Sequence, residues 1–214
     1  MRRLKDAGIK VVAVVPTVAH AVRMEAEGVD AVVASGTEAG GHVGTVATLP
    51  LVPQVVDAVR IPVIAAGGIG DARGFLAAFA LGAQGVQMGT RFMATAESDL
   101  NAWGRARLIA MRETETIVTR AMTGATVRCI ATPEIAAYEA ALARNAPEAE
   151  ITALKRAVRG TRYDGPKDER RQSAAGQIAG LIHDAPTVSA LIDGLLAEAG
   201  RLAGRLPGLA ARSG

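Results

Sequence analysis

The sequence predicts an α/β fold with a buried parallel sheet. Hydrophobic residues make up 50% of the chain, but aromatic residues only 3%. The core must therefore be built from Ala, Val, Leu and Ile, as in proteins with buried parallel strands. Short apolar runs alternate with helical patterns, which is typical of right-handed β-α-β units. Glycines gather directly after these runs, where sheets of this kind hold their ligands.

The strands are predicted from four short apolar runs. Each is rich in β-branched or small apolar residues, and each ends in a turn or a glycine cluster, which indicates a buried strand. The four runs are Val11–Val15, Ala31–Ala34, Pro62–Ala66 and Gly85–Met88.

Helical patterns fill the intervals between the runs. Thr17 can cap a helix that continues to about Glu27 and is closed by Gly28. Leu51, Val52, Val55, Val56 and Val59 recur at helical spacing before the strand that begins at Pro62. Asp71 can cap a third helix that stops at Gly82, and a fourth covers roughly residues 99–112. Such a β-α alternation is compatible with an α/β barrel or with an open doubly wound sheet.

Beyond about residue 114 the pattern changes. A short β-like run, Thr116–Thr119, precedes helical stretches near residues 133–144, 147–159, 168–183 and 186–203. The residues after 203 read as a flexible tail.

Composition argues against several classes of function. The net charge of +3 comes from scattered Arg and Lys residues without interleaved aromatics, so nucleic-acid binding has little support. The single cysteine, Cys129, and three scattered histidines give no metal-ligand spacing and no internal disulfide. No apolar run is long enough to span a bilayer or to serve as a signal peptide. We therefore expect a cytoplasmic protein that uses neither a metal nor a membrane.

The first motif that could take part in chemistry is Glu38–Gly44, after the second predicted strand. Its paired glycines, Gly40 and Gly41, let the backbone pass close to a ligand, because no Cβ stands in the way. His42 is carried on the same loop, and its imidazole can exchange a proton near neutral pH. The alternative is a histidine that only binds a loop carbonyl. The glycine setting favours a catalytic role for His42.

Two further glycine loops indicate a phosphate site. Gly67 and Gly68 lie between a strand and the start of a helix, where free N–H groups and the helix dipole favour an anion. Taken alone, this loop could be a tight turn. The next strand, however, leads into a second such loop, Gln87–Arg91, which adds a hydroxyl and a cation. Phosphate loops after two adjacent strands reinforce each other.

Taken together, these segments resemble the nitronate monooxygenase family, formerly called 2-nitropropane dioxygenases. The flavin-dependent enoyl-ACP reductases of the same superfamily share them. The resemblance continues to about residue 203. The segments that carry it are Glu38–Gly44, Pro62–Asp71, Ala80–Phe92, Glu97–Ser98, Thr116–Thr123 and Gly176–Ile182.

The resemblance implies a (β/α)8 TIM barrel that binds FMN. It places the FMN phosphate between Gly68 and the Gln87–Thr90 loop, brings Gly40 close to the flavin, and makes His42 the base that acts on a neutral nitroalkane. Ser35 stands where these families usually carry Gln or Glu, so its reach toward the flavin is shorter. The implied cofactor-binding residues are Ser35, Gly40, Gly41, Gly67, Gly68, Gln87, Met88, Gly89, Thr90, Gln177 and Gly180.

Measured against the family, the chain contains only the last four β-α units. We therefore expect residues 1–114 to form half of a TIM barrel, residues 115–203 a helical extension that completes the flavin site, and residues 204–214 a flexible tail. Either the chain is part of a longer protein, which we favour, or two copies pair as a homodimer, since four strands cannot close an eight-stranded barrel.

Three functions stay open at this point. The first is oxidation of nitronates or nitroalkanes by O2 with FMN. The second is reduction of enoyl thioesters by NAD(P)H with the same cofactor. The third belongs to another class: a catalytically incomplete half-barrel that binds phosphate or a partner chain.

Overall fold

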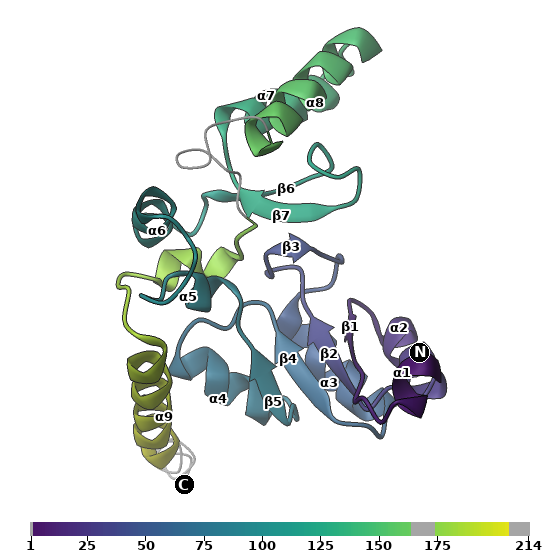
Figure 1. The fold of residues 1–214 in the computed structure, drawn as a ribbon, viewed down its shortest axis with the longest axis vertical. Helices are drawn as coiled ribbons and strands as arrows, with labels where there is room; N and C mark the ends of the chain where they lie inside the picture. The colour runs from purple at the N-terminus through teal and green to yellow at the C-terminus, as the bar shows by residue number, and fades with distance from the viewer. Residues whose placement is uncertain (1, 164–173, 206–214) are drawn as a thin grey trace, which may run out of the picture.

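The main sheet consists of four parallel strands. The computed structural model describes residues 2–163 and 174–205 (Figure 1). The strands lie side by side in the order β1, β2, β4, β5, so each pairs with the next along the sheet. The predicted α/β class with a parallel sheet is therefore confirmed. The bounds are Val12–Val15 for β1, Ala31–Ser35 for β2, Val63–Ala66 for β4 and Gly85–Gln87 for β5.

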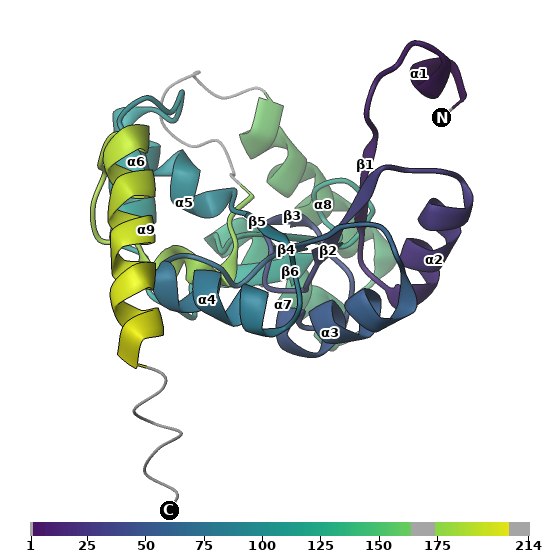
Figure 2. The ribbon, with the colours of Figure 1, turned by 90° about the horizontal axis from the view of Figure 1, so that it is seen from below.

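Three helices cover one side of this sheet, as Figure 2 shows. They are α2 (Val18–Ala26), α3 (Thr48–Ala58) and α4 (Ala72–Ala80). The predicted caps are present: Thr17 accepts from His20 N at 3.2 Å, and Asp71 accepts from Arg73 N at 2.9 Å. Between helices and sheet lies a core of aliphatic residues, as the composition predicts. Its fully buried members include Val15, Val32, Ala34, Leu51, Val52, Val55 and Ala65.

A second, antiparallel sheet stands beside the first. Its strands are β3 (Gly41–His42), β7 (Val127–Ile130) and β6 (Thr116–Thr119), in that order. Only β6 is predicted from the sequence. The motif around His42, which we expect to be a loop, instead contains a two-residue strand in which His42 is opposite Val127.

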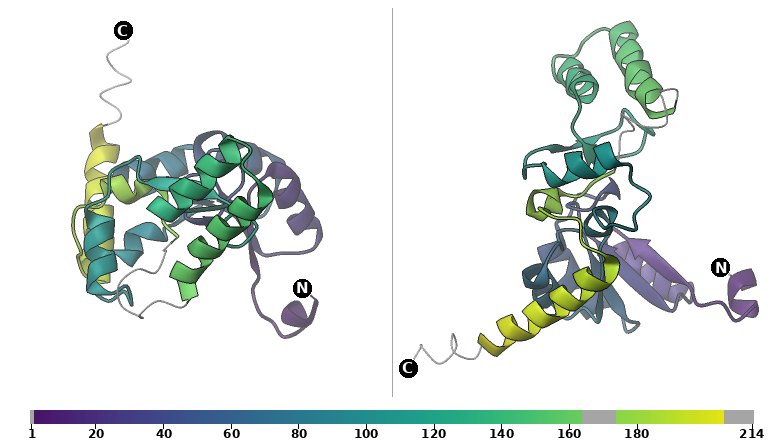
Figure 3. Two further views of the ribbon diagram at one scale, coloured as in Figure 1. Left: turned by 90° about the horizontal axis from the view of Figure 1, so that it is seen from above. Right: turned by 60° about the vertical axis from the view of Figure 1, so that its left-hand side comes forward.

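The remaining helices surround these two sheets. The helices α7 and α8 form a hairpin above β6 and β7, away from the parallel sheet, and α9 packs on α4 (Figures 1 and 3). The bounds are Arg2–Asp6 for α1, Thr90–Met93 for α5, Ala102–Ile109 for α6, Pro133–Ala143 for α7, Glu148–Tyr163 for α8 and Val188–Arg205 for α9. None of the helices in the described ranges is both long and apolar enough to cross a membrane.

One predicted helix, residues 168–183, is wrong in its described part. Residues 174–183 form an extended segment with one short 3-10 helix, η1 (Gln177–Leu181). The cause is tertiary: the amides of Gly176 and Gln177 bond to Thr90 and to Glu38, which belong to the body of the protein. The predicted tail, 204–214, lies outside the described residues except for Gly204 and Arg205, which end α9.

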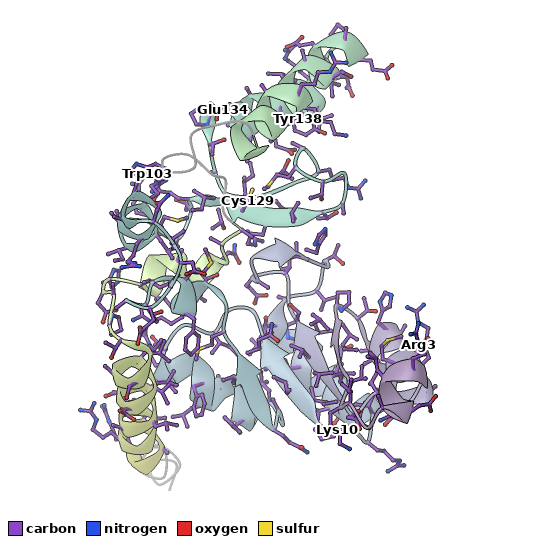
Figure 4. All side chains as sticks on the ribbon, viewed as in Figure 1. Arg3, Lys10, Trp103, Cys129, Glu134 and Tyr138 are labelled. Carbon is purple, nitrogen blue, oxygen red and sulfur yellow. The ribbon has the colours of Figure 1, made fainter. Side chains whose placement is uncertain are left out.

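Cys129 is buried in the small core between β7 and the α7–α8 hairpin (Figure 4). Burial raises the pKa of its thiol to about 11, so its reactive thiolate is scarce near neutral pH. We expect iodoacetamide at about pH 8 to modify folded protein roughly a hundredfold more slowly than protein unfolded in urea, as mass spectrometry can measure. Equal rates would show that this core opens readily. Because the chain has one cysteine, no control for other thiols is needed.

Candidate functional site

A cavity of about 300 Å³ opens at the carboxyl ends of the parallel strands. Its floor comes from the loops that follow β2, β4 and β5, and one side is closed by the segment that contains Ala174, Gly176 and Ile178. Most of the site residues expected from the sequence share this cavity. They are Ser35, Gly40, His42, Gly67, Gly68, Gln87, Met88, Gly89 and Thr90.

Three expected residues do not line the cavity. Gly41 lies on β3 opposite Arg128. Gln177 has an exposed side chain, and its backbone N–H donates inward to Glu38 O at 2.9 Å. Gly180 packs against a neighbouring loop, where a Cβ would lie 2.7 Å from Glu113 N. The 174–178 segment thus contributes Gly176 and Ile178 to the cavity in place of Gln177 and Gly180.

The glycine loops present backbone N–H groups to the cavity. Gly67 and Gly68 have φ angles of 86° and 72°, in the left-handed region that favours glycine. Among the residues that the structure describes, no protein acceptor takes the amide hydrogens of Gly68, Gly89 or Thr90. A Cβ on Gly89 would meet no atom within 4 Å, so this side of the loop is open. Backbone amides that have no protein acceptor and belong to loops lining a cavity can bind an anion.

Two groups that the sequence suggests as ligands for an anion, the N-terminus of α4 and the side chain of Arg91, have partners within the protein instead. Asp71 Oδ1 accepts from Arg73 N and Gly74 N, so the second and third amides of α4 are already satisfied by the cap. The side chain of Arg91 is buried and forms an ion pair with Asp184 at 2.6 Å. The groups that could bind an anion in the cavity are therefore the glycine-loop amides and not the side chain of Arg91.

Glu38 and Arg128 are the polar residues that sequence reasoning missed. Glu38 lines the cavity, and its carboxylate accepts from Thr48 N and Thr48 Oγ1 at 2.9–3.0 Å. Arg128 Nε donates to Thr37 O at 2.8 Å, on the same loop. Burial lowers the pKa of Arg128, and the nearby charge of Glu38 opposes that shift. A charged residue inside the apolar run of β7 is the signal that could have pointed to Arg128.

The 174–178 segment is held on the cavity by close backbone contacts. Gly176 N donates to Thr90 Oγ1 at 2.8 Å. A Cβ on Gly176 would lie 2.7 Å from Glu38 O, and one on Gly40 would lie 2.8 Å from the carbonyl carbon of Ala175. Gly40 is therefore a glycine because another backbone crosses it, a reason the sequence did not suggest.

His42 has an exposed side chain and lines the cavity. The pairing of β3 with β7 holds the backbone of Gly41 and His42, and so sets where the imidazole ring begins. An imidazole so placed can take a proton from a molecule bound in the cavity.

The Arg91–Asp184 pair should contribute measurably to stability. Asp184→Ala leaves the buried guanidinium of Arg91 without its carboxylate, so we expect the free energy of unfolding to fall by about 1–3 kcal/mol. Urea denaturation followed by circular dichroism measures this change. Asp57→Ala, which removes an exposed carboxylate on α3, is the control and should change little. Equal effects of the two variants would contradict this role of the pair.

Comparison with known proteins relates this architecture to one family. The sequence profile described as nitronate monooxygenase matches residues 1–198. A probable nitronate monooxygenase of Staphylococcus aureus strain MSSA476 is 47% identical over 140 residues, which make up 61% of this chain and 39% of that protein. The chain thus spans well under two thirds of the length of this relative.

Two solved structures are similar over nearly the whole chain. FabK from Thermotoga maritima is 38% identical with a TM-score of 0.87, and the match covers 98% of this chain and 67% of FabK. A nitroalkane oxidase from Streptomyces ansochromogenes is 31% identical with a TM-score of 0.75, covering 96% of this chain and 61% of that protein. Because the family profile matches residues 1–198 and both structures match nearly the whole chain, the chain belongs to the nitronate monooxygenase family and is related to FabK.

Proposed function

We propose that this protein oxidises nitronates and nitroalkanes with O2, using FMN. The observation that carries the proposal is that one cavity is lined by glycine loops whose backbone amides have no protein acceptor among the described residues, and by a histidine, in a member of the nitronate monooxygenase family. The nitroalkane oxidase similar to this chain supports the same class of substrate.

The residues present fit the phosphate of FMN. The free amides of Gly68, Gly89 and Thr90 would bind its oxygens, and the absence of a side chain at Gly89 leaves space for it. Pockets of about 300–1,000 Å³ are typical of small-molecule sites, and this cavity is at the lower limit of that range. Ser35, Gly67 and Met88 would lie along the rest of the cofactor.

The chemistry that FMN would supply here is the acceptance of electrons from the nitronate and their transfer to O2. The chain's own part is to bind and to move a proton. A neutral nitroalkane must first lose a proton from the carbon that bears the nitro group. His42 would accept that proton on a ring nitrogen, leaving the nitronate anion. A preformed nitronate needs no such step.

We also propose that the parallel sheet is one arc of a (β/α)8 barrel, made by residues 1–114, with residues 115–203 completing the flavin site. Three observations support this. The strands neighbour one another in chain order. Val12 and Val14 of β1 are 50% and 61% exposed, on the side away from the helices, where a barrel has its interior. Ala174, Gly176 and Ile178, from beyond residue 114, line the cavity.

A second candidate function is reduction of enoyl thioesters by NAD(P)H. The observation in its favour is that FabK has a higher TM-score than the nitroalkane oxidase, together with the motifs that resemble enoyl-ACP reductases. The third possibility is a half-barrel that binds phosphate or a partner chain without catalysis.

One set of assays separates the three candidates. We expect the purified protein to bind FMN, to show flavin absorbance, and to consume O2 when ethyl nitronate is added. NADH-dependent loss of a crotonyl thioester without O2 consumption would favour the reductase. A protein that retains no flavin after incubation with FMN would favour the half-barrel without catalysis.

A further inference from the structure

Arg128 is a buried cation that lies outside the cavity. It is 7% exposed and belongs to the middle strand of the antiparallel sheet, where β7 lies between β3 and β6 (Figure 1). It is not among the residues that line the cavity. Within residues 2–163 and 174–205 no carboxylate forms an ion pair with it, in contrast to Arg91. A buried charge is costly without compensation, so hydrogen bonds must supply it here.

Two hydrogen bonds of the guanidinium join β7 to its neighbours. Nε of Arg128 donates to Thr37 O at 2.8 Å, and Nη1 donates to Thr116 Oγ1 at 3.1 Å. Thr116 begins β6, whereas Thr37 belongs to the loop that follows β2. The backbone of Arg128 lies opposite Gly41, further along the same loop. Arg128 therefore holds this loop at two points, through its side chain at Thr37 and through strand pairing at Gly41.

The loop held in this way carries the histidine side of the cavity. Glu38 and Gly40 lie between the two points, and His42 follows directly. All three line the cavity. The carboxylate of Glu38 is held separately, by Thr48 N and Thr48 Oγ1. The amides proposed to bind phosphate belong to other loops, which follow β4 and β5. A change at Arg128 should therefore displace His42 and leave the phosphate site in place.

The two hydrogen bonds of Arg128 call for a guanidinium. Nε and Nη1 are separate donors of one planar group, and they bind oxygens of two different segments. Lysine carries its charge on one atom at the end of a flexible stem, so it is not pre-organised to hold both oxygens. Arg128→Lys thus keeps the positive charge and loses the fixed connection between loop and sheet.

We propose that Arg128 is a positioning residue for His42. By holding Thr37 and Gly41 together, it sets the place of the imidazole ring at the edge of the cavity. It contacts neither substrate nor cofactor and acts only through the loop. This inference rests on the proposed function, which supplies the proton that His42 accepts.

NMR tests the placement of His42 without relying on turnover. The chain has three histidines, so the untagged protein should give three Cε1–H ring signals, and His42→Ala identifies the one from His42. We expect Arg128→Lys to shift that signal and to leave those of His20 and His183 in place. Arg156→Lys, the same substitution at an exposed arginine of α8, is the control and should shift none. An unshifted His42 signal in Arg128→Lys would overturn the proposal.

Kinetics separate positioning from a general loss of structure. Misplacing a reacting group by about 1 Å can cost roughly a hundredfold in rate. For Arg128→Lys we expect kcat with neutral nitroethane to fall at least about tenfold and kcat with ethyl nitronate to change less than about twofold, because only nitroethane gives a proton to His42. Arg156→Lys should leave both values at those of the wild type. Partial unfolding would lower both alike, so an equal fall would overturn the proposal.

Thr116→Val carries the test if circular dichroism shows that Arg128→Lys does not fold. It keeps Arg128 and removes only the Oγ1 that accepts from Nη1. We expect the same selective loss with nitroethane, reduced to about threefold. A wild-type ratio of the two kcat values would overturn the proposal. If no nitronate were oxidised at all, the proposed function would fail, and the His42 signal would still decide whether Arg128 positions the ring.

Discussion

His42→Ala should lower kcat/KM for neutral nitroethane about a thousandfold and that for ethyl nitronate far less. A positioned general base contributes roughly 10²–10⁴-fold to a rate. Only the neutral nitroalkane needs proton removal from carbon, so only its oxidation should lose this factor. The imidazole lines the cavity on a strand fixed by pairing with β7, so removing it deletes a base without removing a structural support. Oxygen consumption with each substrate measures the two values.

The control for this variant is His20→Ala. His20 is an exposed histidine of α2 whose ring contacts Thr17 Oγ1. It is not among the residues that line the cavity. It should leave both kcat/KM values close to those of the wild type. An equal loss on nitroethane and ethyl nitronate in His42→Ala would argue for a role in substrate binding and against proton transfer. Flavin absorbance of each variant checks that cofactor content is the same.

The parts of the fold that follow local rules could be predicted from the sequence. Asp71 caps α4, and Gly28 and Gly82 adopt positive φ angles directly after α2 and α4. The parallel strands followed from buried runs of β-branched residues between such helices. These features depend on residues near in sequence, where propensity and capping act.

The second sheet could not be predicted, because it depends on pairing between distant segments. Gly41 and His42 become a strand only where β7, more than eighty residues later, offers Val127 and Arg128 as partners. Two residues carry no periodic pattern of their own. The prediction of a helix over the 174–183 segment was wrong for the same reason, because the conformation of this segment is set by hydrogen bonds to Glu38 and Thr90.

The candidate site shows the same division. The glycine loops could be located because glycines that follow buried strands form a local pattern, and Gly68 and Gly89 both line the cavity. What each polar side chain binds was not predictable. Arg91, expected to face an anion, instead pairs with Asp184, which lies 93 residues further along the chain. The carboxylate of Glu38 accepts a hydrogen bond from Thr48 N, and no spacing in the sequence predicts that contact.

The fold should tolerate Gly89→Asp, but cofactor binding should not. The φ angle of Gly89 is −95°, which any residue can adopt, and a Cβ there would meet no atom within 4 Å. The melting temperature should therefore remain within about 2 °C of the wild-type value, as for a surface substitution. The new carboxylate would stand among the amides of Gly68, Gly89 and Thr90, in the place proposed for the phosphate. Two like charges at that distance cost several kcal/mol, so affinity for FMN should fall at least about a hundredfold.

Gly194→Asp is the matched control for Gly89→Asp, because it adds the same charge on the exposed face of α9, where a Cβ also meets nothing. It should bind FMN as the wild type does, as quenching of flavin fluorescence can measure. Riboflavin, which lacks the phosphate, sharpens the comparison: its weaker binding should be nearly the same in Gly89→Asp and wild type, since no phosphate meets the carboxylate. Equal loss of FMN and riboflavin would indicate that the substitution blocks the ring instead. Unchanged FMN affinity in Gly89→Asp would place the phosphate elsewhere and remove the main physical support for a flavin at these loops.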